Sequence, residues 1–111
     1  MIEIKIKPLS VNAAWKGRRF KTDEYKAYEH KLMYVLPKSI VLPEHPYEIH
    51  YEFGFSNIAS DWDNPCKPLQ DILQKKYKFN DKLVYKAVVV KKIVPKGKEY
   101  FKVNIIHYSS D

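Results

Sequence analysis

The chain has one cysteine and three glycines among its 111 residues. With Cys66 alone, no intrachain disulfide can form, which indicates a reducing compartment, the cytoplasm. Gly17, Gly54 and Gly97 stand far apart, so the sequence lacks the glycine-rich loop that binds nucleotide phosphates. The four histidines are scattered and show no zinc-ligand spacing. No apolar run approaches the roughly 18 residues of a membrane-spanning helix, so we expect no membrane partner.

Positive charge is abundant and unevenly placed. The formal net charge is +7, and lysine and arginine concentrate in residues 1–21 and 75–102. Residues 44–63 carry five acids and no lysine or arginine. Basic flanks around an acidic centre suit a polyanion held beside a cation-binding site. Lysine-rich surfaces are also common on proteins that bind no nucleic acid, so charge alone favours such a partner only modestly.

The length and the apolar content of 45% fit one globular domain over residues 1–111. Thr22 is a favourable N-cap for a helix that ends at Pro37, and a second, shorter helix is predicted at about residues 68–77. Alternating and β-branched runs predict strands at 2–7, 47–55, 83–94 and 100–107, the last two as a hairpin. The fold class is therefore α+β, a mixed sheet with two helices packed against it.

Residues 61–71 are the most informative stretch. Asp61 and Asp63 follow an alternating apolar run, and side chains two apart on a strand project from the same face. Paired carboxylates on a rigid element suit a hard divalent cation. Asp81, beyond the second helix, is a further acidic candidate. Alternatively, the Asp-x-Asp-Asn-Pro pattern is a polar strand exit whose acids cap a helix.

The chain contains, in this order, Ser10-x-Asn12-x-x-Trp15-Lys16, then Asp61-x-Asp63-Asn64-x-x-Lys67-x-x-x-Asp71, and then Asp81. Together these blocks, spread over residues 8–92, resemble the RusA family of Holliday junction resolvases. The resemblance implies a small homodimeric endodeoxyribonuclease that depends on Mg²⁺, with Mn²⁺ as a substitute. Such enzymes cut four-way, branched DNA in recombination and repair, and phages, prophages and bacteria encode them.

The resemblance also implies roles for individual residues. Asp61, Asp63 and Asp81 are expected to bind the metal and, together with Lys67, to form the catalytic set. Asp71 matches as a possible additional acid.

The chain departs from the family pattern at two places. Asn80 stands where the family commonly has an acid, which leaves one carboxylate there. Pro65 and Pro68 bracket Lys67, and a proline restricts the residue before it away from helical geometry. We therefore expect Lys67 in an extended turn close to Asp63.

The chemistry can also be argued from the residues. Phosphodiester hydrolysis needs an activated water and an offset phosphate charge, which one or two Mg²⁺ ions supply when carboxylates hold them. The compact ammonium of Lys67 suits stabilisation of the developing charge. A salt bridge from Lys67 to Asp63 or Asp71 is the structural alternative, and both roles are compatible.

Contacts with DNA are expected from two basic segments. Lys16, Arg18 and Arg19 belong to a predicted tight turn, where Trp15 or Phe20 is available to stack on an unpaired base. The second segment is Lys75 and Lys76, on the second predicted helix.

Two functions from different classes remain open. One is the junction endonuclease, and the other is a non-catalytic nucleic-acid-binding module whose acidic residues are structural. Convergence of Asp61, Asp63 and Asp81 around one ion would favour the first, and scattered acids would favour the second.

Overall fold

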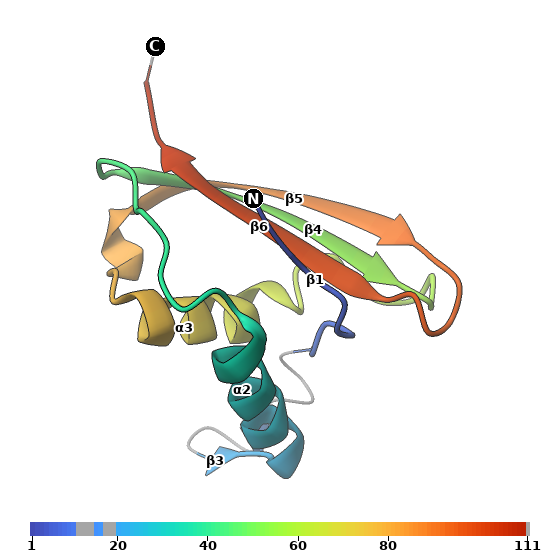
Figure 1. Cartoon of the computed structure of the whole chain (residues 1–111). Coiled ribbons are helices and arrows are strands. Elements are labelled where there is room, and N and C mark those ends of the chain that lie inside the picture. The colour runs from blue at the N-terminus through green and yellow to red at the C-terminus, as the bar shows by residue number, and fades with distance from the viewer. Residues whose placement is uncertain (11–14, 17–19, 111) are drawn as a thin grey trace.

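The computed structural model describes residues 1–10, 15–16 and 20–110. It confirms the α+β prediction, because both helices pack on a mixed sheet and lie on the same side of it (Figure 1). The strands are β1 (Ile2–Ile4), β2 (Trp15–Lys16), β3 (Phe20–Lys21), β4 (Tyr47–Phe55), β5 (Val84–Ile93) and β6 (Tyr100–His107). The helices are α2 (Asp23–Val35), α3 (Cys66–Tyr77) and the single 3₁₀ turn η1 (Asp81–Leu83). The main sheet has the order β1-β6-β4-β5, and β2 pairs with β3 separately.

Strand β4 is the centre of the sheet. It pairs in parallel with β5 and antiparallel with β6. The predicted hairpin of residues 83–94 with residues 100–107 is therefore wrong, because β4 lies between these strands. The reason is that β4 buries every second side chain against the helices, and a strand so buried needs a partner on each of its two edges.

Helix α2 begins as its sequence predicts. The Thr22 hydroxyl accepts a hydrogen bond from the backbone N–H of Tyr25 at 3.1 Å, which satisfies one of the free N–H groups of the first turn. Tyr25, Tyr28 and Leu32 are buried on one face of the helix, in agreement with the spacing of its apolar residues.

Helix α3 begins at Cys66, two residues earlier than predicted. Pro65 is its N-cap and Pro68 lies in its first turn, where the absence of a proline N–H breaks no intrahelical hydrogen bond. The expectation that Lys67 lies in an extended turn is therefore wrong, since Lys67 is helical. The Tyr51 hydroxyl donates to Gln70 Oε1 at 2.9 Å and ties α3 to β4.

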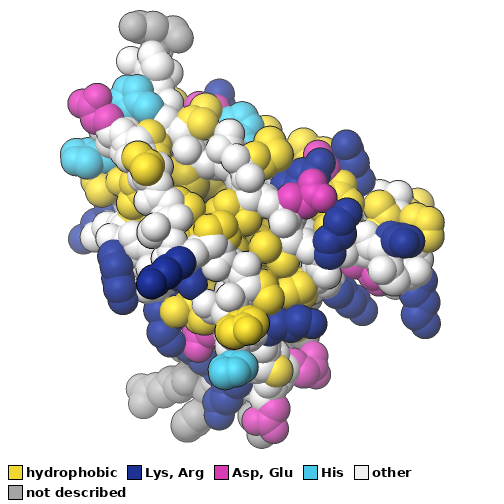
Figure 2. Space-filling model, viewed as in Figure 1, with side chains coloured by type: hydrophobic (Ala, Val, Ile, Leu, Met, Phe, Trp, Pro, Cys, Tyr) yellow, Lys and Arg dark blue, Asp and Glu magenta, His cyan; other side chains and the backbone are white. Residues whose placement is uncertain are grey.

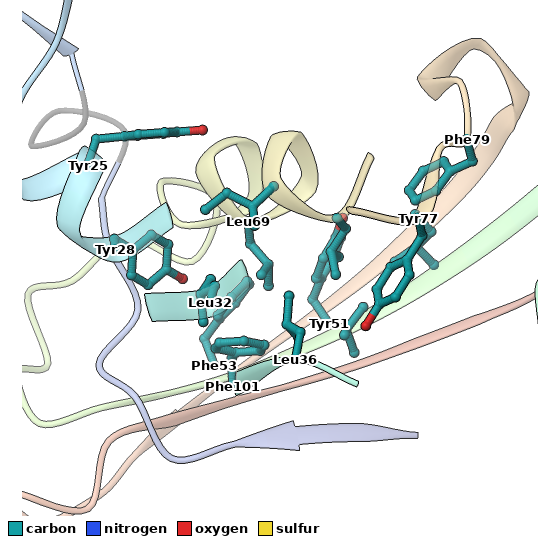
Figure 3. Packing of buried hydrophobic residues seen from close by; sticks show 14 of the residues in the cluster. Tyr25, Tyr28, Leu32, Leu36, Tyr51, Phe53, Leu69, Tyr77, Phe79 and Phe101 are labelled. Carbon is teal, nitrogen blue, oxygen red and sulfur yellow. The ribbon is translucent and has the colours of Figure 1, made fainter. Parts of the chain in front are cut away.

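One hydrophobic core joins the helices to the sheet. Figure 3 shows Leu32, Leu36 and Leu69 from the helix layer lying against Phe53 and Phe101 of the sheet. All five side chains are almost completely buried, so burial of apolar surface is the main stabilising contribution at this layer.

No helix in the part of the chain that the structure describes is both long enough and apolar enough to cross a membrane.

Gly54 provides a test of the packing between β4 and β6. It lies opposite Tyr100 in the register, and a Cβ at Gly54 would fall far inside van der Waals contact with the Tyr100 ring. We expect Gly54→Ala to lower the free energy of unfolding by about 1–3 kcal/mol, as overpacking does elsewhere. Urea unfolding measures this change in the free energy of unfolding. The double variant Gly54→Ala/Tyr100→Ala should lose less than the sum of the single changes, and strict additivity would contradict the contact.

Candidate functional site

The two central acids lie on a loop rather than on a strand. Strand β4 ends at Phe55, and the chain then turns, since Ser60 N–H donates to the Asn57 carbonyl at 3.1 Å. Asp61 and Asp63 follow on residues 56–65, which we name the acidic loop, and both are exposed. The prediction that strand geometry makes them parallel is wrong, because β4 stops six residues before Asp61.

Asp61 lines a cavity of about 450 Å³ at one side of the acidic loop. Asn64 Nδ2 donates to Asp61 Oδ2 at 3.2 Å, which orients this carboxylate. Ser10 and Lys7, from the segment after β1, line the same cavity. Ser10 of the first sequence block thus lies at the same cavity as Asp61 and Asn64 of the second, although some fifty positions separate them.

Lys67 lies in the first turn of α3, immediately after the acidic loop. Its ammonium is 3.0 Å from Asp71 Oδ1, one helical turn along. The side chain of Lys67 is 59% exposed, and pairs of this kind on helix surfaces contribute only about 0.3–0.5 kcal/mol. Of the two partners considered from sequence, Asp71 is the one observed, and this weak bridge leaves the lysine within reach of solvent.

Asp81 lies elsewhere. It begins η1, after the far end of α3 and directly before β5. The twelve residues of α3 span about 18 Å, and Figure 1 shows the helix running from the acidic loop toward the opposite end of the sheet. The neighbouring Asn80 has a structural role, because its side-chain oxygen accepts the Lys82 N–H at 2.9 Å and caps η1.

The carboxylates consequently do not form one three-acid metal site within a single chain. Among residues 1–10, 15–16 and 20–110, no group of three or more His, Cys, Asp or Glu side chains is arranged to hold a metal ion. Asp61 and Asp63 supply two carboxylates at one end of α3, and Asp81 supplies one at the other.

The expected DNA contacts divide into two groups. Arg18 and Arg19 lie outside the described residues, and Lys16 belongs to β2. Lys75 and Lys76 are engaged within the protein: Lys75 pairs with Glu29 of α2 at 3.2 Å, and Lys76 donates to the Met33 carbonyl at 2.7 Å. These two lysines join α2 to α3. Figure 2 shows further Lys side chains over the end of the sheet where β5 leads to β6.

Three residues near the site were not predicted from the sequence. Lys7 and Glu24 line the Asp61 cavity, and their only signal is charge, which many surface residues share. Trp62 is 56% exposed between the two acids. An indole flanked by two aspartates is a detectable signal, since so large an apolar side chain is seldom left in water without a partner.

Cys66, at the first position of α3, is partly buried and packs against the hydrophobic core. Burial raises the pKa of its thiol to about 11, and the nearby Asp63 carboxylate adds to this shift. The thiol is therefore protonated at neutral pH and is a poor nucleophile.

Comparison with models of known protein families gives no match, and no curated protein matches the chain. The resemblance to the RusA family therefore stays a prediction that depends on the motifs themselves.

The raised pKa of Cys66 can be tested by alkylation. Because the thiolate is the reacting species, the rate of reaction with iodoacetamide should rise with pH toward a midpoint near 11 rather than 9.0. Asp63→Asn should move the midpoint downward, because it removes a negative charge that disfavours the thiolate. The urea-unfolded chain provides the control, and a folded-state midpoint at or below 9.0 would contradict the burial of the thiol.

Proposed function

We propose that this protein is a Mg²⁺-dependent endonuclease of the RusA type, acting on branched DNA as a homodimer in the cytoplasm. One observation carries the proposal. Ser10 of the first sequence block and Asp61 and Asn64 of the second, recognised separately in the sequence, line one cavity, and Lys67 lies in the first turn of the helix that follows. If the acids had only structural roles, there would be no reason for Ser10, Asp61 and Asn64 to line the same cavity.

The residues at this end of α3 suit the handling of a phosphodiester. Asp61 and Asp63 are exposed oxygen donors of the type that Mg²⁺ prefers, and such an ion offsets phosphate charge and activates water. Lys67 exchanges its weak bridge to Asp71 for a phosphate oxygen at little cost. Lys7 adds a second ammonium to the wall of the Asp61 cavity.

Asp81 joins this set only if it comes from a second copy of the chain. Within one chain α3, about 18 Å long, lies between Asp63 and Asp81, whereas a two-fold axis can bring Asp81 of each copy to the acidic loop of the other. Paired cuts in a four-way junction also need two sites related by a two-fold. The proposed dimer therefore meets both requirements.

The second candidate function is a nucleic-acid-binding module without catalysis. It is favoured by the separation of Asp81 from the other two acids. In that function the ion pair of Asp71 with Lys67 stabilises the surface of α3, and the hydrogen bond between Asn64 and Asp61 stabilises the acidic loop. The net charge of +7 supplies the affinity for DNA.

Cleavage of a synthetic four-way junction distinguishes the two functions. We expect Mg²⁺-dependent cutting by the wild-type chain and loss of cutting by orders of magnitude in Asp63→Asn, with junction affinity kept or increased because an anion is removed. Asp23→Asn, at the start of α2, makes the same change at an aspartate that does not line the Asp61 cavity and should cut normally. Binding without cutting by the wild type would favour the non-catalytic module. Near wild-type cutting by Asp63→Asn would show that Asp63 is not a metal ligand of the nuclease.

A mixing experiment tests the second copy. Asp63→Asn and Asp81→Asn should each be inactive alone. If the site combines residues of two chains, a heterodimer of the variants holds one intact site, so an equal mixture should recover nicking at about a quarter of the wild-type sites. If all ligands come from one chain, no heterodimer site is intact. A mixture as inactive as its components, with subunit exchange verified by mass, contradicts the shared site.

A further inference from the structure

Trp62 borders a second hollow, separate from the Asp61 cavity. This hollow is open, has a volume of about 420 Å³, and is lined by Trp62 with Ala87, Val89 and Lys91 of β5. None of these four residues lines the Asp61 cavity. Asp61 and Trp62, neighbours on the loop, thus line two separate hollows.

Hydrogen bonds anchor the backbone of the acidic loop next to the exposed indole of Trp62. Lys91 Nζ donates to the Ile58 carbonyl at 2.7 Å and also to the Ser60 carbonyl, which fastens the loop to β5. The Trp62 carbonyl accepts the Cys66 thiol at 3.8 Å, which fastens it to α3. An aromatic ring on such an anchored backbone loses little conformational entropy when a ligand covers it.

The lining of the hollow suits a nucleobase. An indole offers a flat π-face, Ala87 and Val89 offer an apolar floor, and bases stack on aromatic rings in a way that tolerates any sequence. A base within a duplex is already stacked on its neighbours, so only an unpaired base is free to enter. The phosphate beside that base then lies next to Asp61 and Asp63.

We propose that Trp62 stacks on an unpaired base of single-stranded DNA and so selects branched over duplex DNA. This inference rests on the proposed function for its DNA substrate and names the structural feature that the site recognises. A second copy of the chain is the competing occupant, because β5 is an edge strand of the sheet and edges can pair with other chains. The favoured occupant is DNA, since Lys91 lines the hollow and the chain carries a net charge of +7, which attracts a polyanion.

Binding without metal tests the inference apart from catalysis. The chain has two tryptophans, so Trp15→Phe leaves Trp62 as the only tryptophan reporter and Trp62→Phe leaves Trp15. In EDTA, oligothymidine should quench the fluorescence of the first variant saturably and that of the second weakly. Anisotropy of a labelled oligonucleotide should show roughly ten-fold weaker binding by Trp62→Ala, with much less change for a duplex of equal length.

Ile58→Ala is the matched control. Ile58 belongs to the same loop, is 80% exposed and lines neither hollow, so this variant should bind oligothymidine like the wild type. Equal affinities of Trp62→Ala and the wild type for oligothymidine, or quenching that follows Trp15 alone, would overturn the inference. So would a change of oligomeric state in Trp62→Ala, by sedimentation, with oligothymidine affinity unchanged. Because no cleavage is measured, loss of the nuclease function leaves these readouts intact.

Discussion

The structure depends on the buried face of β4. Tyr47, Ile49, Tyr51, Phe53 and Phe55 project from one side of this strand and are all buried. Their burial requires helices on that side and hydrogen-bonded strands on both edges. The parallel partner β5 can be reached only through a crossover, and α3 supplies it. The acidic loop is the first part of that crossover, so its position follows from the core.

The opposite face of the sheet shows how a single-layer sheet remains stable in water. The alternate residues of β4 are Glu48, His50 and Glu52, and lysines of β5 and β6 pair with the two glutamates. Tyr100 donates a hydrogen bond to Glu52 at 2.5 Å, which lowers the pKa of this carboxyl. Lysines on this face are thus partly neutralised, so the net positive charge belongs mainly to other surfaces, including the loop between β5 and β6.

The candidate site residues lie at the two opposite ends of α3. Its first turn adjoins the acidic loop, with Asp63 and Lys67, and its last turn leads to Asn80 and Asp81. The length of a helix fixes the distance between its two ends. Asp81 of one chain therefore does not reach Asp61 and Asp63 of the same chain. The same rigidity gives two copies a fixed spacing between the donor groups they would exchange. The tryptophan between the acids adds an exposed aromatic surface to the loop.

Much of this protein is determined by local sequence. The alternation of residues 47–55, the Thr22 cap and the apolar face of α2 correctly predicted a strand, a helix start and an α+β fold, because each depends on periodicity or on one neighbouring hydrogen bond. Pairing between strands was decided by tertiary structure, since β5 takes its partner from the burial of β4 and not from chain proximity. The start of α3 at Cys66 was also missed, because the proline rule is relaxed in a first turn. The meeting of Ser10 with Asp61, and the distance of Asp81 from both, are likewise properties of the folded chain, because residue spacing along a sequence does not report distance once a sheet and a crossover helix intervene.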